Sequence, residues 1–407
     1  MTTSMEAVLT PWVTQLKARA NLPVLLRWGE GDAHTSGLRL GDFAQPKVEI
    51  HIRKASAIPL LLSPGLDSLG EAYVEGQIDV TGRVEDILDA AHRLSEAGSN
   101  PEGRLARVVR HFSHNKKSDS EAIQYHYDVS NEFYQAWLDP AMVYSCAYFE
   151  TGSETLAEAQ QKKIDHILTK LQLQPDQRLL DIGCGWGALV LRAAGKFGAR
   201  CVGITLSQRQ FELATERVRQ AGLQDRIEIR LQDYRDVQGT FDRITSVGMF
   251  EHVGIKYLKD YFGQINRLLT DDGWVLNHGI TSTDANDGET SFGGGRFIDR
   301  YVFPHGEVPH ISTVLKTMQE GGLEATDVEG LRRHYALTMS HWSRAFEANA
   351  DRLRAMVDEK RWRIWRVYLA GCQWAFEHDE ISLYQVLCRK AARPSAGQPW
   401  SRKWMYA

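Results

Sequence analysis

A buried strand that leads into a glycine-dense turn and then into a helix is the feature that most constrains this chain. The run RLLDIGCGWGALVLRAAG begins at Arg178, and Gly183, Gly185 and Gly187 alternate in its turn. Glycine lets the backbone approach a ligand closely, and the start of the following helix presents free N–H groups to an anionic end. The sequence therefore predicts a ligand site at this turn.

Short apolar runs alternate with helical patterns from about residue 160 onward, in the order of a doubly wound α/β sheet. Helices are expected over residues 188–197, 207–222 and 257–270. The predicted sheet is mainly parallel and has seven strands, at residues 178–183, 200–205, 227–232, 241–247, 274–280, 323–331 and 382–390.

At 407 residues, with 43% hydrophobic and 25% charged residues, the chain has the composition of a globular protein of two or three domains. Residues 1–98 are expected to form a small α+β domain that binds lipid or dimerises, since their polar residues do not converge on a catalytic motif. This domain combines an opening helix, β-rich runs at 24–31 and 47–55, and helical stretches at 66–77 and 84–94. A polar linker, residues 99–122, precedes a larger domain at 123–407.

The charge of the whole chain gives no reason to expect a nucleic-acid partner, because the net charge is −4. Basic residues do gather in the linker, where Arg104, Arg107 and Arg110 lie three apart on one helical face. One interpretation is a solvated linker helix. The other is contact with anionic lipid headgroups, to which each basic residue near the surface contributes about 1 kcal/mol.

The five cysteines are scattered, without the spacing of a metal site or a disulfide framework. Their pattern indicates a reducing compartment. The amino end lacks the features of a signal peptide, and no stretch reaches the ~18 apolar residues of a membrane span. The expected location is the cytoplasm, with visits to a membrane surface.

The spacing of the glycines argues against a dinucleotide and for S-adenosylmethionine. A dinucleotide fold favours GxGxxG with an acidic residue about 20 residues later. Here the pattern is GxGxG preceded by Asp181, and the second strand ends in GITLSQRQ without an acid. Asp181 is expected to meet the cofactor's ammonium group, and Asp233 after the third strand its adenine amino group. The alternatives are a tightly packed turn and an exposed loop acid.

Several longer motifs make the resemblance specific: HYDVSNEFYQAWLDPAMVYSCAYF, LDIGCGWG, GITLSQRQ, FDRITSVGMFEHVG, FIDRYVFPHGEVP and HYALTMSHW. With them the sequence resembles the cyclopropane-fatty-acyl-phospholipid synthase family over essentially its whole length. The resemblance implies an α/β fold of the class I methyltransferase type, with a Rossmann-like seven-stranded sheet and a smaller α+β amino-terminal domain. It also implies that residues 123–407 are the catalytic domain.

The resemblance also assigns site residues. For the cofactor it implies Tyr144 and Ser145 at the methionine part, Gly183 and Gly185 beneath it, Thr205 and Gln210 at the ribose, and Gln232 and Asp233 at the adenine. For catalysis it implies a bound bicarbonate that removes a proton, surrounded by Cys146, Glu251, His278, Ile280 and Tyr335.

The implied activity is transfer of a methylene group to the cis double bond of an unsaturated phospholipid acyl chain. The implied setting is a homodimer at the inner face of the cell membrane, and the extra amino-terminal domain favours phospholipids over mycolic acids. Two alternatives stay open at this point. One is methyl transfer without ring closure, and the other is a lipid-binding protein without catalysis.

Overall fold

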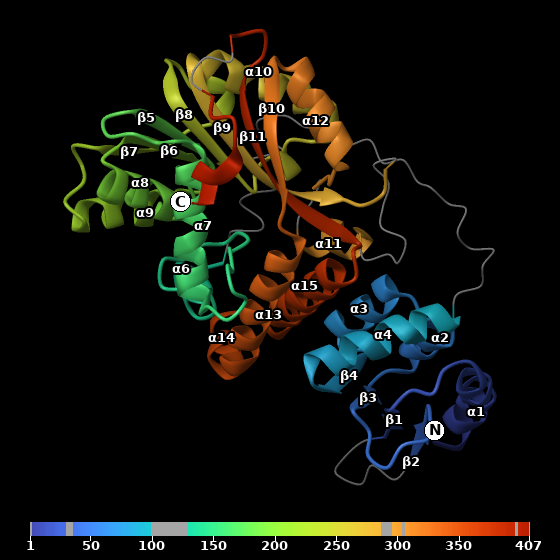
Figure 1. The fold of residues 1–407 in the computed structure, drawn as a ribbon. Helices are drawn as coiled ribbons and strands as arrows, with labels where there is room; N and C mark the ends of the chain where they lie inside the picture. Colours follow the sequence, from blue (N-terminus) through green and yellow to red (C-terminus); the bar gives the residue numbers. More distant parts are fainter. Residues whose placement is uncertain are drawn as a thin grey trace. The chain divides into compact units, whose positions relative to one another are not determined.

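The computed structural model describes residues 2–29, 36–98, 129–285, 295–302, 306–394 and 398–406. Contacts divide the chain into two compact units, each drawn in Figure 1. The amino-terminal unit comprises residues 1–110, 290–302 and 351–374, and the sheet unit comprises 111–289, 303–350 and 375–407. The expected linker at 99–122, with Arg104, Arg107 and Arg110, lies outside the described residues.

The amino-terminal unit is built on a four-stranded sheet in the order β2-β1-β3-β4. β1 is antiparallel to β2 and parallel to β3, and β3 is antiparallel to β4. Both β-rich runs and both helical stretches predicted here are present, as β1, β3, α3 and α4. The elements are α1 (Thr2–Arg19), β1 (Val24–Trp28), β2 (Ser36–Arg39), β3 (Val48–Ile52), η1 (Ala55–Ala57), α2 (Ile58–Leu62), α3 (Leu66–Val74), β4 (Ile78–Gly82) and α4 (Val84–Gly98).

Two segments from late in the sequence belong to this unit. They carry α11 (Gly295–Tyr301), nearly all of α14 (Ala350–Met356) and most of α15 (Glu359–Glu377). The Phe297 amide donates to Asp67 Oδ1 at 3.0 Å, and Arg363 pairs with Asp79 at 2.7 Å. The expected catalytic range of 123–407 thus supplies parts of the amino-terminal unit, a grouping that local sequence patterns do not indicate.

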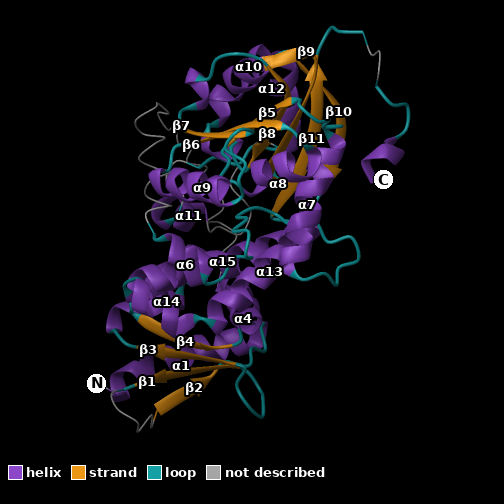
Figure 2. Ribbon diagram, turned by 90° about the vertical axis from the view of Figure 1, so that its left-hand side faces the viewer, coloured by secondary structure: helices purple, strands orange, loops and turns teal. Residues whose placement is uncertain are grey.

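The sheet unit contains the predicted seven strands, in the order β10-β11-β9-β8-β5-β6-β7. β11 is antiparallel to both of its neighbours, and the pairs from β9 through β7 are parallel. The strands are orange in Figure 2. They are β5 (Arg178–Ile182), β6 (Arg200–Thr205), β7 (Ile227–Leu231), β8 (Phe241–Val247), β9 (Leu269–Ser282), β10 (Leu323–Gly330) and β11 (Ile381–Lys390).

Helices cover both faces of this sheet because successive strand residues point to opposite sides. Leu180 packs in a core with residues of α10 and α12, whereas Leu179 packs in a second core with residues of α7 and α8. The helical elements of the unit are α6 (Asn131–Gln135), α7 (Leu156–Lys170), α8 (Ala188–Phe197), α9 (Gln208–Gln220), η3 (Tyr234–Asp236), η4 (Phe250–His252), η5 (Ile255–Tyr257), α10 (Leu258–Leu268), α12 (Ile311–Glu320), α13 (Arg332–Ala348) and η6 (Arg402–Tyr406).

Strand β5 lies at the point where the order in which the chain adds strands to the sheet reverses. The chain passes from β5 outward to β6 and β7 on one side, and then returns to pair β8 with the other side of β5. Ligands of open α/β sheets bind beyond the carboxyl ends of the strands at such a switch point. The topology therefore places the glycine turn that follows β5 where a ligand site is expected.

No helix in the described part of the chain is both long and apolar enough to cross a lipid bilayer.

Candidate active site

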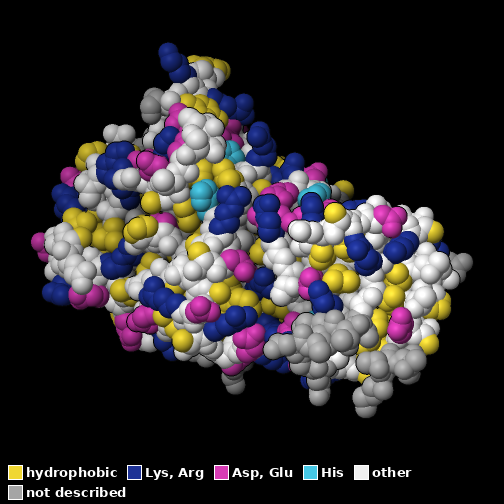
Figure 3. Space-filling view, turned by 90° about the horizontal axis from the view of Figure 1, so that it is seen from below, with side chains coloured by type: hydrophobic (Ala, Val, Ile, Leu, Met, Phe, Trp, Pro, Cys, Tyr) yellow, Lys and Arg dark blue, Asp and Glu magenta, His cyan; other side chains and the backbone are white. Residues whose placement is uncertain are grey.

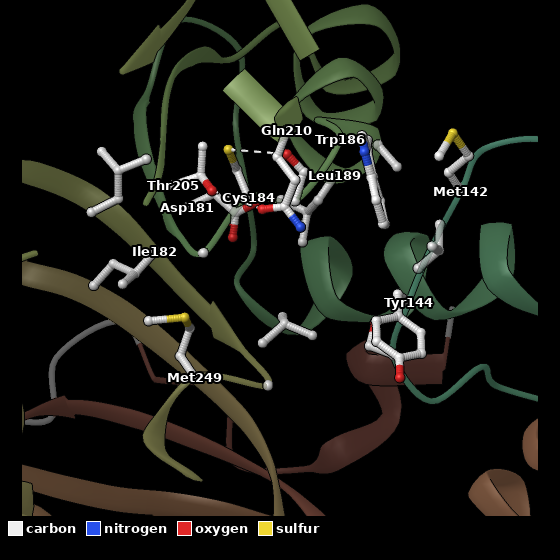
Figure 4. Close-up of a pocket in the computed structure, with 18 of the residues that line it drawn as sticks. Met142, Tyr144, Asp181, Ile182, Cys184, Trp186, Leu189, Thr205, Gln210 and Met249 are labelled. Atoms are coloured by element: carbon white, nitrogen blue, oxygen red, sulfur yellow. Dashed lines mark hydrogen bonds between the residues drawn. The ribbon is translucent and has the colours of Figure 1, made fainter. Parts of the chain in front are cut away.

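A pocket opens at the carboxyl ends of β5, β6 and β8, bordered by the glycine turn. It is lined by eight of the nine residues expected to hold the cofactor, Asp233 being the exception, and Figure 4 shows many of the lining side chains. Tyr144 and Met249 lie on opposite sides of the space. The eight residues are Tyr144, Ser145, Asp181, Gly183, Gly185, Thr205, Gln210 and Gln232.

The glycine turn has the left-handed backbone that favours glycine, with φ of 80° at Gly183, 54° at Gly185 and 85° at Gly187. A Cβ at Gly183 would lie 2.5 Å from Met249 Cγ and Sδ, whereas a Cβ at Gly185 would meet nothing within 4 Å. Gly187 ends the turn as the N-cap residue of α8. The turn thus exposes backbone at the pocket wall, as the sequence predicts.

Asp181 is the buried acid of the pocket, 3% exposed at the penultimate position of β5. Its Oδ1 accepts a hydrogen bond of 2.7 Å from Thr245 Oγ1 on the neighbouring β8. Burial raises the pKa of Asp181 to about 6, although the Thr245 bond and the charge of Lys163 oppose the rise. A cationic ligand group beside this carboxyl would stabilise its ionised form.

A buried lysine that sequence reasoning missed positions the loop carrying Tyr144 and Ser145. Lys163 Nζ donates to Ser145 Oγ at 2.6 Å, and Gln160 Nε2 donates to the Ser145 carbonyl at 2.7 Å. Burial lowers the pKa of Lys163 to about 8. A signal for its burial did exist, because Ala159, Lys163 and Ile167 recur at the four-residue spacing of one helix face.

Thr205, at the end of β6, is in contact with Gln210, the other residue expected at the ribose. Its hydroxyl donates to Gln210 Oε1 at 2.7 Å and accepts from the Ser207 amide at 3.1 Å. The Gln232 amide donates to the Thr205 carbonyl at 3.1 Å, which connects the ends of β6 and β7. The expected ribose pair and Gln232 therefore lie next to each other.

Asp233 does not line the pocket, although it directly follows Gln232. Its carboxylate accepts from the Arg235 guanidinium at 2.8 and 2.7 Å and from the Arg235 amide at 2.8 Å. Arg235 therefore engages both oxygens of the acid expected at the adenine.

A second cluster of expected residues lies beyond β8 and along β9. Glu251 in η4 accepts from the Ile280 amide at 2.7 Å, and the Gly248 amide donates to the His278 carbonyl at 2.8 Å. Both side chains are buried, with 8% and 1% of the residue exposed. No described residue reaches Glu251 Oε2 or His278 Nε2 with a hydrogen bond. Two buried polar atoms thus lack a partner within the described part of the chain.

Burial is the largest cause of the pKa shifts of Glu251 and His278, and the two shifts are in opposite directions. It raises the pKa of Glu251 to about 7, against a smaller opposing effect of the Ile280 hydrogen bond. Burial, followed by the charges of Lys163 and Lys170, holds the pKa of His278 well below its ordinary value. His278 is therefore a neutral imidazole near pH 7, and Glu251 titrates there.

Cys146 and Tyr335 join this cluster through the loop before α7 and the start of α13. Cys146 Sγ lies 3.9 Å from the Leu331 carbonyl, and the Leu331 amide donates to the Leu383 carbonyl on β11, opposite Ile280. Burial raises the pKa of the Cys146 thiol, which is therefore protonated at neutral pH. Tyr335, one turn into α13, is buried and stacks on Phe376 with ring centroids 4.4 Å apart.

All five cysteines of the chain are free, as their scattered positions indicate. Of the five residues expected at the bicarbonate, Glu251 is hydrogen-bonded to the Ile280 amide, two residues after His278 on β9. Cys146 and Tyr335 are linked to this strand through the backbone of Leu331 and Leu383. None of the five lines the cofactor pocket. Met249 and Gly248 line the pocket and are immediate neighbours of η4. The two sites therefore share the segment that follows β8.

Comparison with known proteins agrees with this arrangement. Residues 114–386 match the family described as mycolic acid cyclopropane synthetase, and residues 12–101 match a domain of unknown function. A probable fatty acid methyltransferase of Pseudomonas putida is 44% identical over 408 residues, covering 99% of this chain and all of that protein. The cyclopropane-fatty-acyl-phospholipid synthase of Escherichia coli K12 is 33% identical over 344 residues, covering 83% and 87%.

Among solved structures, mycolic acid cyclopropane synthase CmaA1 complexed with SAH and CTAB aligns with a TM-score of 0.63 and 36% identity. The alignment covers 67% of this chain and 98% of that one. The fold, the pocket after β5 and these relatives agree with one another. The chain belongs to the mycolic acid cyclopropane synthetase family and is an S-adenosylmethionine-dependent methyltransferase of the class I fold.

Proposed function

We propose that this enzyme transfers a methylene group from S-adenosylmethionine to the cis double bond of an unsaturated phospholipid acyl chain, and that a bound bicarbonate accepts the proton lost on ring closure. The observation that carries the proposal is the pair of buried atoms, Glu251 Oε2 and His278 Nε2, for which no described residue is a partner. An isolated polar atom in a protein interior costs about 1–3 kcal/mol, and a hydrogen-bonding ligand shared by these two atoms would remove that cost.

The cofactor pocket fits S-adenosylmethionine. Asp181 is positioned by Thr245 to receive an ammonium group, and the backbone of Gly183 and Gly185 is exposed to the methionine part. Thr205 and Gln210 are the proposed ribose residues, and Gln232 with Asp233 the proposed adenine residues. For Asp233 this requires one of the carboxylate oxygens that Arg235 engages to accept a further hydrogen bond from the adenine, as a carboxylate oxygen can.

The second cluster fits a small hydrogen-bonding anion such as bicarbonate. A neutral His278 can donate one N–H to an oxygen, and Glu251, with its pKa of about 7, can accept from the anion's hydroxyl. The Tyr335 hydroxyl completes the proposed shell, with Cys146 beside it, and the Ile280 amide would have to exchange Glu251 Oε1 for the anion to join them. Because burial keeps the Cys146 thiol protonated, it brings no second negative charge to the site.

The sulfonium of the cofactor supplies an electrophilic methyl group, and its transfer to an alkene leaves a carbocation on the acyl chain. Ring closure then requires a base within reach of the new methyl group. Glu251 cannot fill that role directly without the risk of alkylation, and its Oε1 is held by the Ile280 amide. Glu251 is therefore proposed to raise the basicity of the anion by accepting its hydrogen bond.

A phospholipid substrate is supported by the Escherichia coli relative, which is named for that substrate and covers the amino-terminal unit in part. Residues 1–98 are proposed to bind lipid or to pair two chains, at the inner face of the cell membrane. On the face drawn in Figure 3, Lys and Arg are interspersed with Asp and Glu, so this face has no broad basic surface. The proposed contact with anionic lipid rests on the sequence of the linker, in which Arg104, Arg107 and Arg110 lie three apart.

The test uses vesicles of unsaturated phospholipid and methyl-labelled cofactor, in bicarbonate-depleted and bicarbonate-replete buffer. The proposal predicts label in the acyl chains, at a rate that rises with bicarbonate. Glu251→Gln should remove the bicarbonate dependence, whereas Glu228→Gln, an exposed residue paired with Arg230, should not. Label in the headgroup, or no label in lipid, would reject the substrate, and a rate indifferent to bicarbonate would reject the base.

A further inference from the structure

We propose that Gln385 is a positioning residue that fixes the proton of His278 on Nε2, so that the free nitrogen of this histidine is a hydrogen-bond donor. The inference rests on the proposed function for its consequence, because a donor at Nε2 is what an anion beside His278 requires. Its structural basis is a series of contacting side chains that runs from the partly buried Glu329 through the fully buried Lys170 and Gln385 to His278.

Gln385 lies on β11 directly opposite His278 on β9 and is fully buried. Its Nε2 lies 3.3 Å from His278 Nδ1, and its Oε1 accepts from Lys170 Nζ at 3.0 Å. Lys170, at the end of α7, is also fully buried. The amide of Gln385 therefore bridges an ammonium group and an imidazole.

The ammonium determines the orientation of this amide. An ammonium group has only donors, so the oxygen of Gln385 must face Lys170 and the NH₂ group must face His278. An amide N–H can only donate, so His278 Nδ1 must be the acceptor and carries no proton. A neutral imidazole has a single proton, which is then on Nε2.

Carboxylates contact the Lys170 ammonium, at the far end of this series of side chains from His278. Glu329 Oε2 lies 2.5 Å from Lys170 Nζ and 2.9 Å from His166 Nε2, and Asp327 lies 3.9 Å from the same ammonium. Burial works against ionisation of Glu329, but the His166 hydrogen bond and the charge of Lys170 lower its pKa to about 2. A charged Lys170 is thereby stabilised within the protein, and the Gln385 oxygen cannot turn away from it without losing a partner.

The location of the single proton decides what His278 offers to a ligand. With the proton on Nε2, the buried nitrogen donates to an oxygen of an anion. With the proton on Nδ1, the same nitrogen presents a lone pair that repels that oxygen. Groups that orient a metal-binding histidine in this way change affinity or activity by about 10–100-fold, and we expect an effect of this size at His278.

The experiment is ¹⁵N NMR of the full chain with ¹⁵N-labelled histidine, in buffer depleted of bicarbonate, with the His278 signals assigned from a His278→Gln variant. The inference predicts that wild-type His278 is neutral and protonated on Nε2. In Gln385→Met this preference should be lost, and the bicarbonate concentration for half-maximal turnover should rise about tenfold or more, at unchanged affinity for the cofactor.

Gln264→Met is the matched control, since Gln264 is another buried glutamine of the sheet unit that bonds to the Tyr234 and Val237 carbonyls. It should leave the tautomer of His278 unchanged. A wild-type His278 protonated on Nδ1 would overturn the inference, and this measurement needs no variant to fold. A wild type with the proton on Nε2 but a rate indifferent to bicarbonate would reject the proposed base and leave the role of Gln385 standing.

Discussion

Replacement of Glu251 by glutamine separates the proposed catalytic role of this residue from its cost to stability. Glu251 is buried, and only one of its two carboxylate oxygens, the acceptor for the Ile280 amide, has a partner among the described residues. Glutamine keeps the size and an oxygen for the Ile280 amide but cannot ionise. The substitution should therefore remove a charge that the fold disfavours and the reaction requires.

The magnitude follows from the pKa of Glu251, which burial raises from 4.5 to about 7. The folded state thus holds this proton more tightly than the unfolded chain does. The resulting stabilisation is complete below pH 4.5 and is lost as the pH rises through about 7. At about 1.4 kcal/mol per pKa unit, the loss amounts to about 3 kcal/mol at pH 8.

Thermal unfolding of the bicarbonate-free protein at pH 5 and pH 8 measures this effect. Glu251→Gln should melt a few degrees above wild type at pH 8, and the difference should fall to about a quarter of that value at pH 5. Turnover should fall by about 10-fold to 100-fold, because the anion loses the group that raises its basicity, at unchanged affinity for S-adenosylmethionine. Glu228→Gln serves as the exposed control for both measurements.

Two results would refute this reasoning. A Glu251→Gln protein that is less stable than wild type at pH 8 would show that the carboxylate is not disfavoured by burial. A variant that loses cofactor binding in parallel with turnover would show that Glu251 belongs to the cofactor site.

Three further substitutions test the separate parts of the site. Tyr335→Phe should lower turnover about 100-fold with little change in cofactor affinity, measured by steady-state kinetics and calorimetry. Asp181→Asn should weaken cofactor binding by about 10–100-fold, the worth of a hydrogen bond to a charged group, and equal affinity in calorimetry would contradict the ammonium contact. Gly183→Ala should lose about 1–2 kcal/mol of stability, and so should the control Gly222→Ala, because the two glycines have φ of 80° and 66°. Only Gly183→Ala should also weaken cofactor binding, because only its Cβ meets Met249.

The sheet could be predicted from the sequence because its strands are short apolar runs bounded by turn residues. The predicted helices are present as α8, α9 and α10, within two residues at each end. β9 begins at Leu269, five residues before the predicted start at Trp274. The misplaced boundary has a clear origin, since Asp271, Asp272 and Gly273 have the composition of a turn but are part of the strand.

The composition of the amino-terminal unit could not be predicted in the same way. The segments at 290–302 and 351–374 join it through contacts such as Arg363 with Asp79, which are 284 residues apart in sequence. A helical pattern predicts which face of a helix is apolar but not which distant surface covers that face. The strand β4, with its polar Asp79 and Thr81, was missed because its burial is partial.

Only some residues of the candidate site could be predicted from the sequence. Residues in continuous motifs could be named in advance, whereas Lys170 and Gln385 could not, because charged and amide side chains are usually exposed. Their burial depends on partners that come from other elements, as the bond from Lys170 to Gln385 shows. The orphaned atoms of Glu251 and His278 are likewise visible only in three dimensions.

The proposed reaction makes a methyl group from S-adenosylmethionine the ring carbon of a cyclopropane on a phospholipid acyl chain. NMR and mass analysis of the lipid formed from unsaturated phospholipid vesicles and cofactor with a trideuterated methyl group tests this directly. We expect a cyclopropane ring whose new carbon retains two deuterons, since one is lost to the base. A methyl branch that retains all three deuterons, or a methylene branch with its vinylic carbon, would contradict it.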